Sequence, residues 1–414
     1  MTVRWITPLL GTAPADEMQN FIDVQVVDVR DLVDKGGNRT EAVKEKIMAG
    51  VHHLRNGAKT IVCCDYGISR SNAIAAGILA VHEQIPFSDA VRTVQEQTGE
   101  KEIKLEPLNV VRRAIENRSD KKKTAGKRAI LVTGAHGFVG TQVMRGLKDK
   151  FDVIAPTHES LDVGQGGTQL SLLVDQHDVD CILHLASPRV YTSNSALGET
   201  LVMLRNVLDV CVSQDVSLIY PSSWETYSGY AGTLLADEAV AALPRGPYGE
   251  TKHLAELMIK HWQQTTGLRC ALIRSSPVYG SGSKKPKFIY NFVEKAQKSE
   301  TIITHRYLNG EPALDLLHID DLVAVLAMVC EQEYVGTLNV GTGIATSTRL
   351  IAEILKHELG SNSAIEQTEI ETSVACVAMN YRKAEQALGW RPRVALHDGL
   401  KQLLADYLDE GNEK

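Results

Sequence analysis

The chain contains 414 residues, of which 43% are hydrophobic, 23% charged and 5% aromatic, and its formal net charge is -7. This balance of apolar and charged residues excludes a wholly disordered or collagen-like chain. The length predicts two or three domains at about 150 residues each. A net acidic chain has no general electrostatic reason to bind nucleic acid or an anionic membrane.

The first residues, MTVRWITPLLGTAPADEMQ, lack a basic segment followed by an apolar one, and no apolar run approaches the ~20 residues that span a bilayer. We therefore expect a cytoplasmic protein without membrane partners. Seven cysteines without a Cys-x-x-Cys pair resemble neither a secreted disulfide framework nor a zinc site. We expect no bound metal.

A short basic segment, Arg118–Arg128, separates two parts of the chain. Its sequence RSDKKKTAGKR offers no large apolar side chain to bury, so we interpret it as a solvated linker rather than a nucleic-acid patch. The predicted boundaries are 1–117 for the first domain, 118–127 for the linker and 128–414 for the second domain, whose substrate lobe comprises about 281–312 and 343–414.

Both domains show the alternation of strands and helices that is typical of α/β folds. In the first domain, strands are predicted at Val24–Val29 and Thr60–Cys63, and helices at Thr40–Leu54 and Ser71–Glu83. In the second, apolar strands are predicted at Ala129–Thr133, Asp180–Leu185 and Val216–Tyr220, with helices between them. The second pattern predicts a doubly wound parallel sheet with helices on both faces.

The first candidate site is the segment Cys64–Ser71, CDYGISRS, between a predicted strand and a predicted helix. A thiolate at a strand end, amides that curl around an anion and an arginine six residues later form a phosphate cradle. The helix N-terminus and Arg70 favour the nucleophilic thiolate of Cys64. Arg70 can also bind two phosphate oxygens at once.

This segment resembles the signature of the dual-specificity branch of the protein tyrosine phosphatases, which is Cys, five residues, Arg, then Ser or Thr. The resemblance implies that Cys64 forms a phosphocysteine, that Arg70 binds the phosphoryl group and that Ser71 helps the thiolate leave. The phosphate-binding loop that it implies consists of Asp65, Tyr66, Gly67, Ile68, Ser69 and Arg70. The opening TPLLGTA also resembles this family, so the likeness covers about the first 117 residues.

One residue of the signature departs from the family. Cys63 stands where the family usually has histidine, which removes one support for the thiolate of Cys64. We interpret Cys63 as a buried apolar residue rather than a redox partner. The domain is short for the family and poor in aromatic residues, which favours a small phosphoester, such as a phosphorylated sugar or polyol, over a phosphoprotein.

The general acid of such a phosphatase should be an aspartate near the end of the first predicted strand. Asp31 is the first choice, Asp34 the second and Asp28 the third. Asp28 and Asp31 could instead cap the strand or pair with Arg30.

The second candidate site begins with the turn Gly134–Gly140, which follows an apolar strand and opens a helix. Gly134 permits a tight turn, Gly137 lets a pyrophosphate approach the backbone, and Gly140 allows the helix to pack closely on the strand. Glycines at this spacing, after a strand and before a helix, predict a dinucleotide site.

Three polar residues complete this site. Tyr248 and Lys252 lie one helical turn apart, so the ammonium of Lys252 can stabilise the phenolate of Tyr248. Tyr248 can then donate or accept a proton while a nicotinamide moves a hydride. Ser223 follows a strand at the sheet edge where α/β folds bind ligands, and its hydroxyl can hydrogen-bond the reacting carbonyl or alcohol.

These residues resemble the extended short-chain dehydrogenase/reductase superfamily, in its NAD(P)-dependent epimerase/dehydratase branch. Thr133–Gly140 matches the TGxxGFxG loop of that branch, and Ser223, Tyr248 and Lys252 match its catalytic residues. Further matches are His184–Ala186, Arg274, Val278–Gly280, His318–Asp321, Asn339–Gly341 and Leu388–Pro392. The resemblance covers about residues 128–410 and implies a Rossmann fold and, in many members, a homodimer. The cofactor-binding residues that it implies are Gly134, Gly137, Phe138, Val139, Gly140, Ala186, Tyr248 and Lys252.

Departures from this branch bear on the substrate. Pro277 and Leu314 stand where members that bind nucleotide-activated sugars often have an asparagine and an arginine that pairs with the diphosphate. Losing a charge-assisted contact costs about 1.5–3 kcal/mol, which argues against a nucleotide sugar without excluding it. Glu225 is placed like the glutamate of sugar 4,6-dehydratases, but Trp224 replaces their neighbouring aspartate, so dehydration is not the leading expectation.

The cofactor preference depends on the strand near Asp152–Ala155. It ends in Pro156-Thr157-His158, without the Asp or Glu that would bind a ribose 2′-hydroxyl. This favours NADP slightly over NAD. His158 could contact the 2′-phosphate or be an exposed loop residue.

Together these features predict a bifunctional enzyme. Its first domain would be a cysteine-dependent phosphatase for a small phosphorylated sugar or polyol, and its second an NAD(P)-dependent oxidoreductase or epimerase acting on a sugar. The alternative is an NAD(P)-dependent nucleotide-sugar epimerase/dehydratase whose first domain senses a phosphorylated ligand without turnover. We expect no nucleic-acid partner and a homodimer formed through the second domain.

Overall fold

The computed structural model describes residues 3–35, 37–116, 126–188, 193–283 and 286–412. The chain divides into two units: Met1–Lys127, Glu159–Val179 and Arg205–Val216 form the first, and Arg128–His158, Asp180–Leu204 and Ser217–Lys414 form the second. Residues 118–125 of the predicted linker lie outside the described residues.

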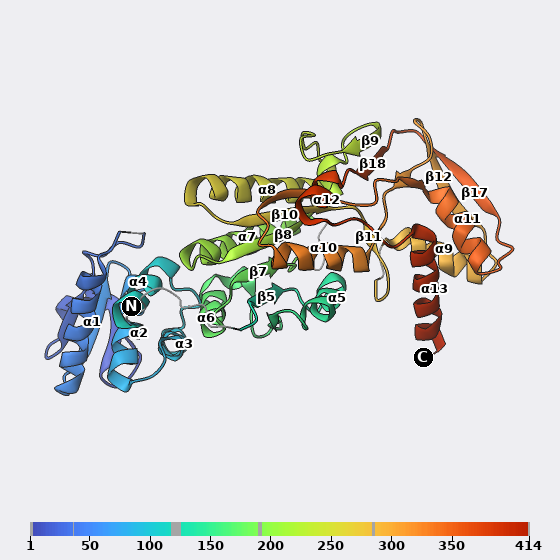
Figure 1. The fold of residues 1–414 in the computed structure, drawn as a ribbon. Helices are drawn as coiled ribbons and strands as arrows, with labels where there is room; N and C mark the ends of the chain where they lie inside the picture. The colour runs from blue at the N-terminus through green and yellow to red at the C-terminus, as the bar shows by residue number, and fades with distance from the viewer. Residues whose placement is uncertain (1–2, 36, 117–125, 189–192, 284–285, 413–414) are drawn as a thin grey trace. The chain divides into compact units, whose positions relative to one another are not determined.

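The first unit, which includes the blue end of the ribbon in Figure 1, contains a four-stranded sheet in the order β1-β2-β4-β3. Strands β2 and β3 run parallel to β4, and β1 is antiparallel to β2. The central strand β4 is buried along its whole length, as its sequence TIVCC allows. The strands are β1 (Arg4–Trp5), β2 (Leu10–Pro14), β3 (Gln25–Asp28) and β4 (Thr60–Cys64), and the helices before the linker are η1 (Ala15–Asn20), α1 (Thr40–Arg55), α2 (Arg70–Glu83), α3 (Phe87–Thr98) and α4 (Leu105–Glu116).

Helix α2 follows β4 and packs against α1, α3 and α4. Every residue from Arg70 to Ala80 is buried, because the small side chains of this segment let its neighbours approach on all sides. At Gly77 a Cβ atom would lie 2.7 Å from a methyl group of Val111. This close packing fixes the first turn of α2, and with it Arg70, directly after the end of β4.

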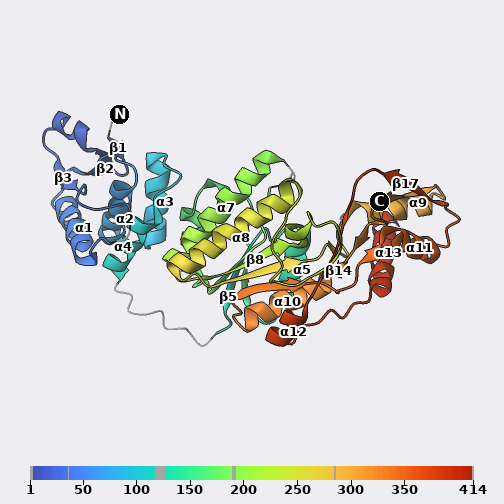
Figure 2. The ribbon, with the colours of Figure 1, turned by 90° about the horizontal axis from the view of Figure 1, so that it is seen from above.

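The sheet of the second unit has six parallel strands in the order β15-β10-β8-β7-β5-β6. This parallel arrangement confirms the predicted Rossmann-like fold. Helices α8 and α10 lie on opposite faces of the sheet (Figures 1 and 2). Its strands are β5 (Ala129–Thr133), β6 (Asp152–Ile154), β7 (Cys181–His184), β8 (Ser217–Ser223), β10 (Cys270–Ser275) and β15 (Gly336–Val340), and its principal helices are α5 (Phe138–Leu147), α8 (Gly246–Thr266), α10 (Ile319–Glu331) and α12 (Arg382–Leu388).

Strand β8 extends three residues beyond the predicted end at Tyr220. Pro221 has no N–H to donate, which favours a strand end in the sequence. The neighbouring strand β10 nevertheless continues the pairing, with Ile273 opposite Pro221 and Ser275 opposite Ser223. Ser222 and Ser223 therefore lie within the strand.

Several further elements of the second unit form a lobe with its own apolar core. Helices α9, α11 and α13 and strand β12 contribute to this core, and β12 pairs in parallel with β17. The lobe elements are β12 (Ile302–Tyr307), β13 (Ala313–Leu314), β16 (Thr346–Ser347), β17 (Ile365–Ile370), α9 (Lys287–Gln297), α11 (Thr348–Glu358) and α13 (Leu396–Asn412). The other elements of the chain are η2 (Val163–Gln165), α6 (Thr168–Gln176), α7 (Asn194–Ser213), η3 (Trp224–Tyr227), β9 (Gly232–Ala236), β11 (Val278–Tyr279), β14 (Leu317–His318) and β18 (Ala375–Met379). Within the part of the chain described, no helix is long and apolar enough to cross a membrane.

Candidate functional site

The cysteine loop, residues 64–71, turns tightly between β4 and α2. Cys64 is buried at the end of β4, and its Sγ lies 3.5 Å from the Oγ of Ser71. Burial raises the pKa of the Cys64 thiol, but hydrogen bonds from the Ser71 hydroxyl and from the backbone at Ser71, Ile68 and Tyr66 outweigh burial and lower the pKa below its ordinary value. These hydrogen bonds favour the thiolate form of Cys64.

Gly67 sets the shape of this loop. Its φ is 65°, and a Cβ atom at this position would lie 2.5 Å from the carbonyl carbon of Ala13. Arg4 donates a hydrogen bond to the carbonyl of Gly67 and pairs with Glu100. A larger residue at 67 would push the loop away from β2.

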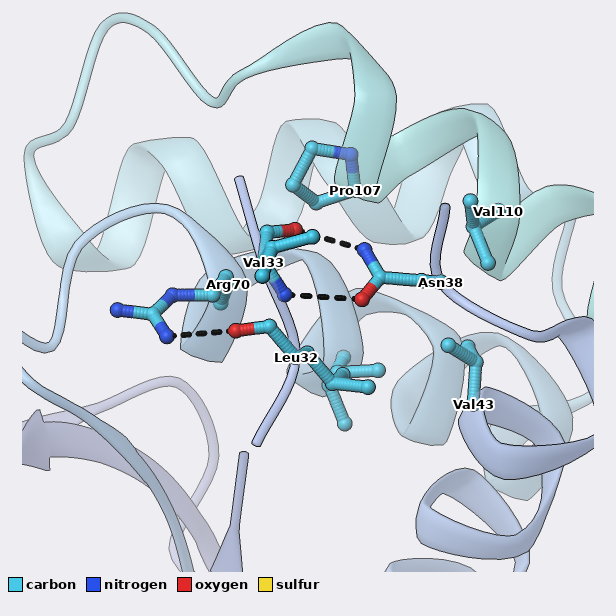
Figure 3. Close-up of a pocket in the computed structure, with 8 residues that line it drawn as sticks. Leu32, Val33, Asn38, Val43, Arg70, Pro107 and Val110 are labelled. Atoms are coloured by element: carbon cyan, nitrogen blue, oxygen red, sulfur yellow. Dashed lines mark hydrogen bonds between the residues drawn. The ribbon is translucent and has the colours of Figure 1, made fainter. Parts of the chain in front are cut away.

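Arg70 is buried, and its two terminal guanidinium nitrogens donate hydrogen bonds. Nη1 donates to the carbonyl oxygens of Leu32 at 2.7 Å and Arg30 at 3.2 Å, and the first of these bonds is drawn in Figure 3. Nη2 donates to Oδ2 of Asp65 at 2.5 Å, and Nε lies 3.7 Å from Oδ1 of Asp34. The arginine thus joins the cysteine loop to the segment that carries the candidate acids.

Two of the three candidate acids pair with other basic side chains. Asp28 accepts hydrogen bonds from Nε and Nη2 of Arg30, and these bonds lower the pKa of Asp28. A lowered pKa disfavours the protonated form that a general acid requires. The first choice, Asp31, has 64% of its side chain exposed and forms an ion pair of 2.9 Å with Lys46.

Asp34, the second choice, is the candidate that contacts Arg70. Its other carboxylate oxygen, Oδ2, accepts a hydrogen bond of 2.9 Å from Nζ of Lys104. Asn38 holds the backbone beside it, accepting from the N–H of Val33 at 2.8 Å and donating to its carbonyl at 2.7 Å (Figure 3). Asp34 is thus paired with basic side chains, as Asp28 and Asp31 are, and the choice of the general acid stays a prediction.

Cys63 is buried beside Cys64, and burial raises the pKa of its thiol to about 11. Such a thiol stays protonated at neutral pH, which agrees with the interpretation of Cys63 as an apolar residue. All seven cysteines are free. In the described residues, no group of three or more His, Cys, Asp or Glu side chains is arranged to hold a metal ion.

The glycine turn of the second unit has the geometry that a dinucleotide requires. Gly134 has a φ of 70°, and a Cβ atom there would lie 2.6 Å from the backbone nitrogen of Ala186. A Cβ atom on Gly140 would lie 2.4 Å from the carbonyl oxygen of Gly134. At Gly137, just before α5, the nearest described atom would be 3.4 Å away, so the backbone is open to a pyrophosphate at the helix N-terminus. The residues present therefore fit a dinucleotide.

The flanking cofactor candidates lie around this turn. Ala186 donates from its N–H to Oγ1 of Thr133 at 3.2 Å, and the same hydroxyl lies 2.8 Å from Nδ1 of His184. Burial and the charge of Lys252 lower the pKa of His184 to about 3, so its ring is neutral. Phe138 and Val139, in the first turn of α5, pack against the core of the sheet. His158 is exposed in the loop after β6.

Lys252 is the central polar group of the second site. Its Nζ donates to the carbonyl oxygen of Pro221 at 2.8 Å and lies 4.7 Å from the ring centre of Tyr220 and 5.8 Å from that of Tyr248. Burial lowers the pKa of Lys252 to about 8, although the negative charge of Glu256 opposes this effect. The ammonium also donates to the hydroxyl of Tyr220 at 3.5 Å, and it lies over the ring of Tyr248, one turn earlier on α8.

Two serines at the end of β8 have different roles. Oγ of Ser222 donates to Oε1 of Glu256 at 2.6 Å, inside the protein. Oγ of Ser223 accepts from the N–H of Glu225 at 3.2 Å and caps η3. Burial raises the pKa of Glu225. Gly249 of α8 approaches this short helix so closely that a Cβ atom would lie 2.6 Å from the carbonyl oxygen of Glu225.

A buried ion pair connects these elements, and the sequence motifs did not reveal it. Glu256 accepts hydrogen bonds from Nε and Nη2 of Arg274 at 2.9 and 2.5 Å, and both side chains are almost completely buried. Nη1 of Arg274 donates to the hydroxyl of Tyr227, which also contacts Oδ1 of Asn339 at 3.3 Å. The one available signal was that Glu256 follows Lys252 by four residues on the same helix.

Comparison with known proteins concerns the second unit. A profile of the NAD dependent epimerase/dehydratase family matches residues 130–341. The chain is 28% identical over 302 residues to a putative UDP-glucose 4-epimerase of Methanocaldococcus jannaschii, covering 66% of this chain and 97% of that protein. It is 26% identical over 314 residues to dTDP-4-dehydro-6-deoxyglucose reductase of Escherichia coli, covering 68% of this chain and 98% of that protein.

Solved structures show the same fold. UDP-glucose 4-epimerase of Thermotoga maritima with UDP-glucose superimposes with a TM-score of 0.59 at 22% identity, over 68% of this chain and 99% of that one. The dTDP-glucose 4,6-dehydratase of Bacillus anthracis in complex with NAD gives a TM-score of 0.60 at 19% identity, over 69% and 98%. The family profile begins at residue 130, so the cysteine loop lies outside it.

Proposed function

Because the chain belongs to the NAD dependent epimerase/dehydratase family, we propose that its second unit oxidises a secondary alcohol on the sugar ring of a nucleotide-activated sugar, with NAD as hydride carrier. The observation that carries this proposal is the glycine turn at Gly134–Gly140 combined with Lys252 and Tyr248 on α8. The names of relatives support the substrate class, since they include a putative UDP-glucose 4-epimerase and a dTDP-sugar reductase.

In this proposal NAD, when bound, accepts the hydride and can return it. Tyr248, as a phenolate, takes the hydroxyl proton of the sugar, and Ser223 donates a hydrogen bond to the reacting oxygen. Lys252 stabilises the phenolate by its charge while Pro221 holds its ammonium in place. The buried pair of Glu256 and Arg274 fixes α8 relative to β10.

Leu314, at the place where an arginine pairs with the diphosphate in related enzymes, is half-buried in β13. The nucleotide diphosphate must therefore be bound by other groups, and the affinity for it should be modest. The slight preference for NADP that the loop after β6 predicts stays a prediction. Both dinucleotides therefore belong in the test.

The test is to incubate the full chain with UDP-glucose, UDP-glucuronic acid and dTDP-glucose, each with NAD and with NADP, and to follow reduced nicotinamide by absorbance and sugar products by chromatography. We expect at least one nucleotide sugar to be converted by the wild type and not by Tyr248→Phe. Tyr334→Phe removes a hydroxyl from a partly buried tyrosine that packs against the core of the parallel sheet and serves as the matched control. Conversion that persists in Tyr248→Phe would contradict the proposed role of the phenol.

A second function is favoured by the geometry of the cysteine loop. We propose that Cys64 hydrolyses a small phosphoester: its Sγ forms a bond to phosphorus while the bond to the ester oxygen breaks, and Asp34 or Asp31 protonates the leaving oxygen. Water then cleaves the phosphocysteine and releases phosphate. The lowered pKa of Cys64, caused by the loop hydrogen bonds that outweigh burial, supports this role.

Phosphate release from a panel of sugar and polyol phosphates tests the second function, with Cys64→Ser as the inactive variant and Cys63→Ser as the matched control. Quenched mass spectrometry should detect a phosphate on Cys64. Binding of the phosphoester without this adduct and without turnover would instead show the sensor domain of the alternative hypothesis. Wild-type phosphate release no faster than that of Cys64→Ser would exclude hydrolysis of those substrates.

A further inference from the structure

Arg70 presents two different edges to its surroundings. Its Nη1 points to carbonyl oxygens of the backbone, and in Figure 3 the rest of the guanidinium points away from Leu32. The opposite edge carries the donors Nε and Nη2. An arginine can use this pair of donors to bind two oxygens of a phosphoryl group at once. In this chain that edge faces two carboxylates, Asp65 at 2.5 Å from Nη2 and Asp34 at 3.7 Å from Nε.

The two carboxylates are held differently. Asp34 is also bonded to Lys104 and has 29% of its side chain exposed. Asp65 directly follows Cys64 in the chain, and 54% of its side chain is exposed. It forms an ion pair with Arg70. A half-exposed carboxylate can rotate into solvent without leaving a buried charge behind, so Asp65 is the group that a ligand can replace.

We propose that Asp65 is an internal ligand of Arg70, which an incoming oxyanion must displace before the cysteine loop can bind it. This inference rests on the proposed phosphate cradle at Cys64 and adds a residue that sets its affinity. Because Asp65 is tethered one residue from Cys64, it competes at a high effective concentration. Nη1 keeps its bonds to the Leu32 and Arg30 carbonyls during the exchange, so the arginine stays in position.

The exchange has a chemical consequence for the ligand. A phosphoryl dianion offers three oxygens, which can reach the loop amides and the freed edge of Arg70 together, whereas Asp65 reaches the arginine only. A carboxylate or another monoanion forms fewer hydrogen bonds in the loop, so it does not displace Asp65 from Arg70 effectively. The native loop should therefore bind tetrahedral dianions weakly and simple carboxylates very weakly, and removal of the Asp65 charge should strengthen both.

Tungstate, a tetrahedral dianion, is the probe for the first measurement, by calorimetry on the full chain. In Asp65→Asn we expect about tenfold tighter binding than in the wild type, because a charge-assisted competitor of Arg70 is lost. Asp89→Asn removes the same charge from an exposed position on α3, where Asp89 pairs with Arg92 at 3.6 Å, and should leave the affinity unchanged. Asp65→Ser, which also lacks the charge, repeats the test with a smaller side chain.

The second measurement compares the rates at which iodoacetate and neutral iodoacetamide alkylate Cys64. A free Arg70 attracts the carboxylate of iodoacetate, so the ratio of the two rates should rise in Asp65→Asn and fall back in Asp65→Asn/Arg70→Gln, which has no positive charge. Equal tungstate affinity in the wild type and Asp65→Asn overturns the inference and leaves the cradle intact. No tungstate binding by any variant, and no protection of Cys64 from alkylation, overturns the cradle itself. A gain that survives Arg70→Gln shows that it does not act through the arginine and also overturns the inference.

Discussion

Replacing Lys252 by methionine tests whether the buried, charged ammonium beside Tyr248 lowers the free energy of unfolding. The substitution keeps an unbranched side chain of similar length and removes the charge. Burial lowers the pKa of Lys252 from 10.5 to about 8. At 1.36 kcal/mol per pKa unit, this difference corresponds to about 3 kcal/mol by which burial disfavours the charged form at neutral pH.

The sign of the pH effect follows from proton binding. The folded-state pKa lies below that of the unfolded chain, so between pH 8 and 10.5 the unfolded chain binds more protons than the folded one. The free energy of unfolding therefore rises with pH in this interval. For the pKa values of Lys252, the rise between pH 7 and pH 9 is about 1 kcal/mol.

Urea unfolding of the wild type and Lys252→Met at pH 7 and pH 9 measures this contribution, since other titrating groups cancel in the difference between the two proteins. The wild type should gain about 1 kcal/mol over the variant. Lys401→Met, which removes a lysine whose side chain is 51% exposed on α13, is the control. A wild-type advantage that does not change between the two pH values would refute the claim that Lys252 is buried as a charge.

Three further predictions concern Gly134, Cys64 and Glu256. Gly134→Ala should abolish NAD binding and lower the free energy of unfolding by more than about 1 kcal/mol, because the φ of 70° and the 2.6 Å contact leave no room for a Cβ atom. Gly198→Ala, in open space on α7, should leave NAD binding unchanged. Calorimetry checks both variants. At pH 7 iodoacetamide should modify Cys64 before Cys63, read by mass spectrometry, because their thiol pKa values are shifted in opposite directions; equal rates would contradict this. Glu256→Gln should lower the unfolding free energy by about 3–5 kcal/mol, since it leaves a buried arginine without its charged partner, and a loss under 1 kcal/mol, roughly, would disprove the buried pair.

Local pattern was enough to predict the framework of both sites. The strand Ala129–Thr133 has the predicted bounds, and α2 begins at Arg70, one residue before its predicted start. In both places an apolar strand is followed by small residues that permit a tight turn, and these features are written in consecutive residues. The glycines at 67 and 134 could be assigned for the same reason, because their roles depend on their own backbone.

Contacts between distant segments could not be predicted in this way. The contact between Asp34 and Arg70 depends on Arg70 reaching across 38 residues to the carbonyl of Leu32 and on Asn38 holding Val33. The sequence places Asp31 nearer to the predicted strand, but only the folded loop shows Asp34 beside the arginine. No periodicity or spacing carries that information.

The pair of Glu256 and Arg274 explains how the fold tolerates the charge of Lys252. A lone ammonium in this position would be disfavoured by burial, and the carboxylate one turn later opposes that effect. Glu256 can remain ionised there because Arg274 and the Ser222 hydroxyl donate hydrogen bonds to its oxygens. Burial raises the pKa of Glu256, but these hydrogen bonds and the charge of Arg274 outweigh burial and lower the pKa. Lys252 in turn anchors α8 to the Pro221 carbonyl, and Ser222 anchors it again through Glu256. Two adjacent strand residues thus fix α8, which carries Tyr248, at two successive turns.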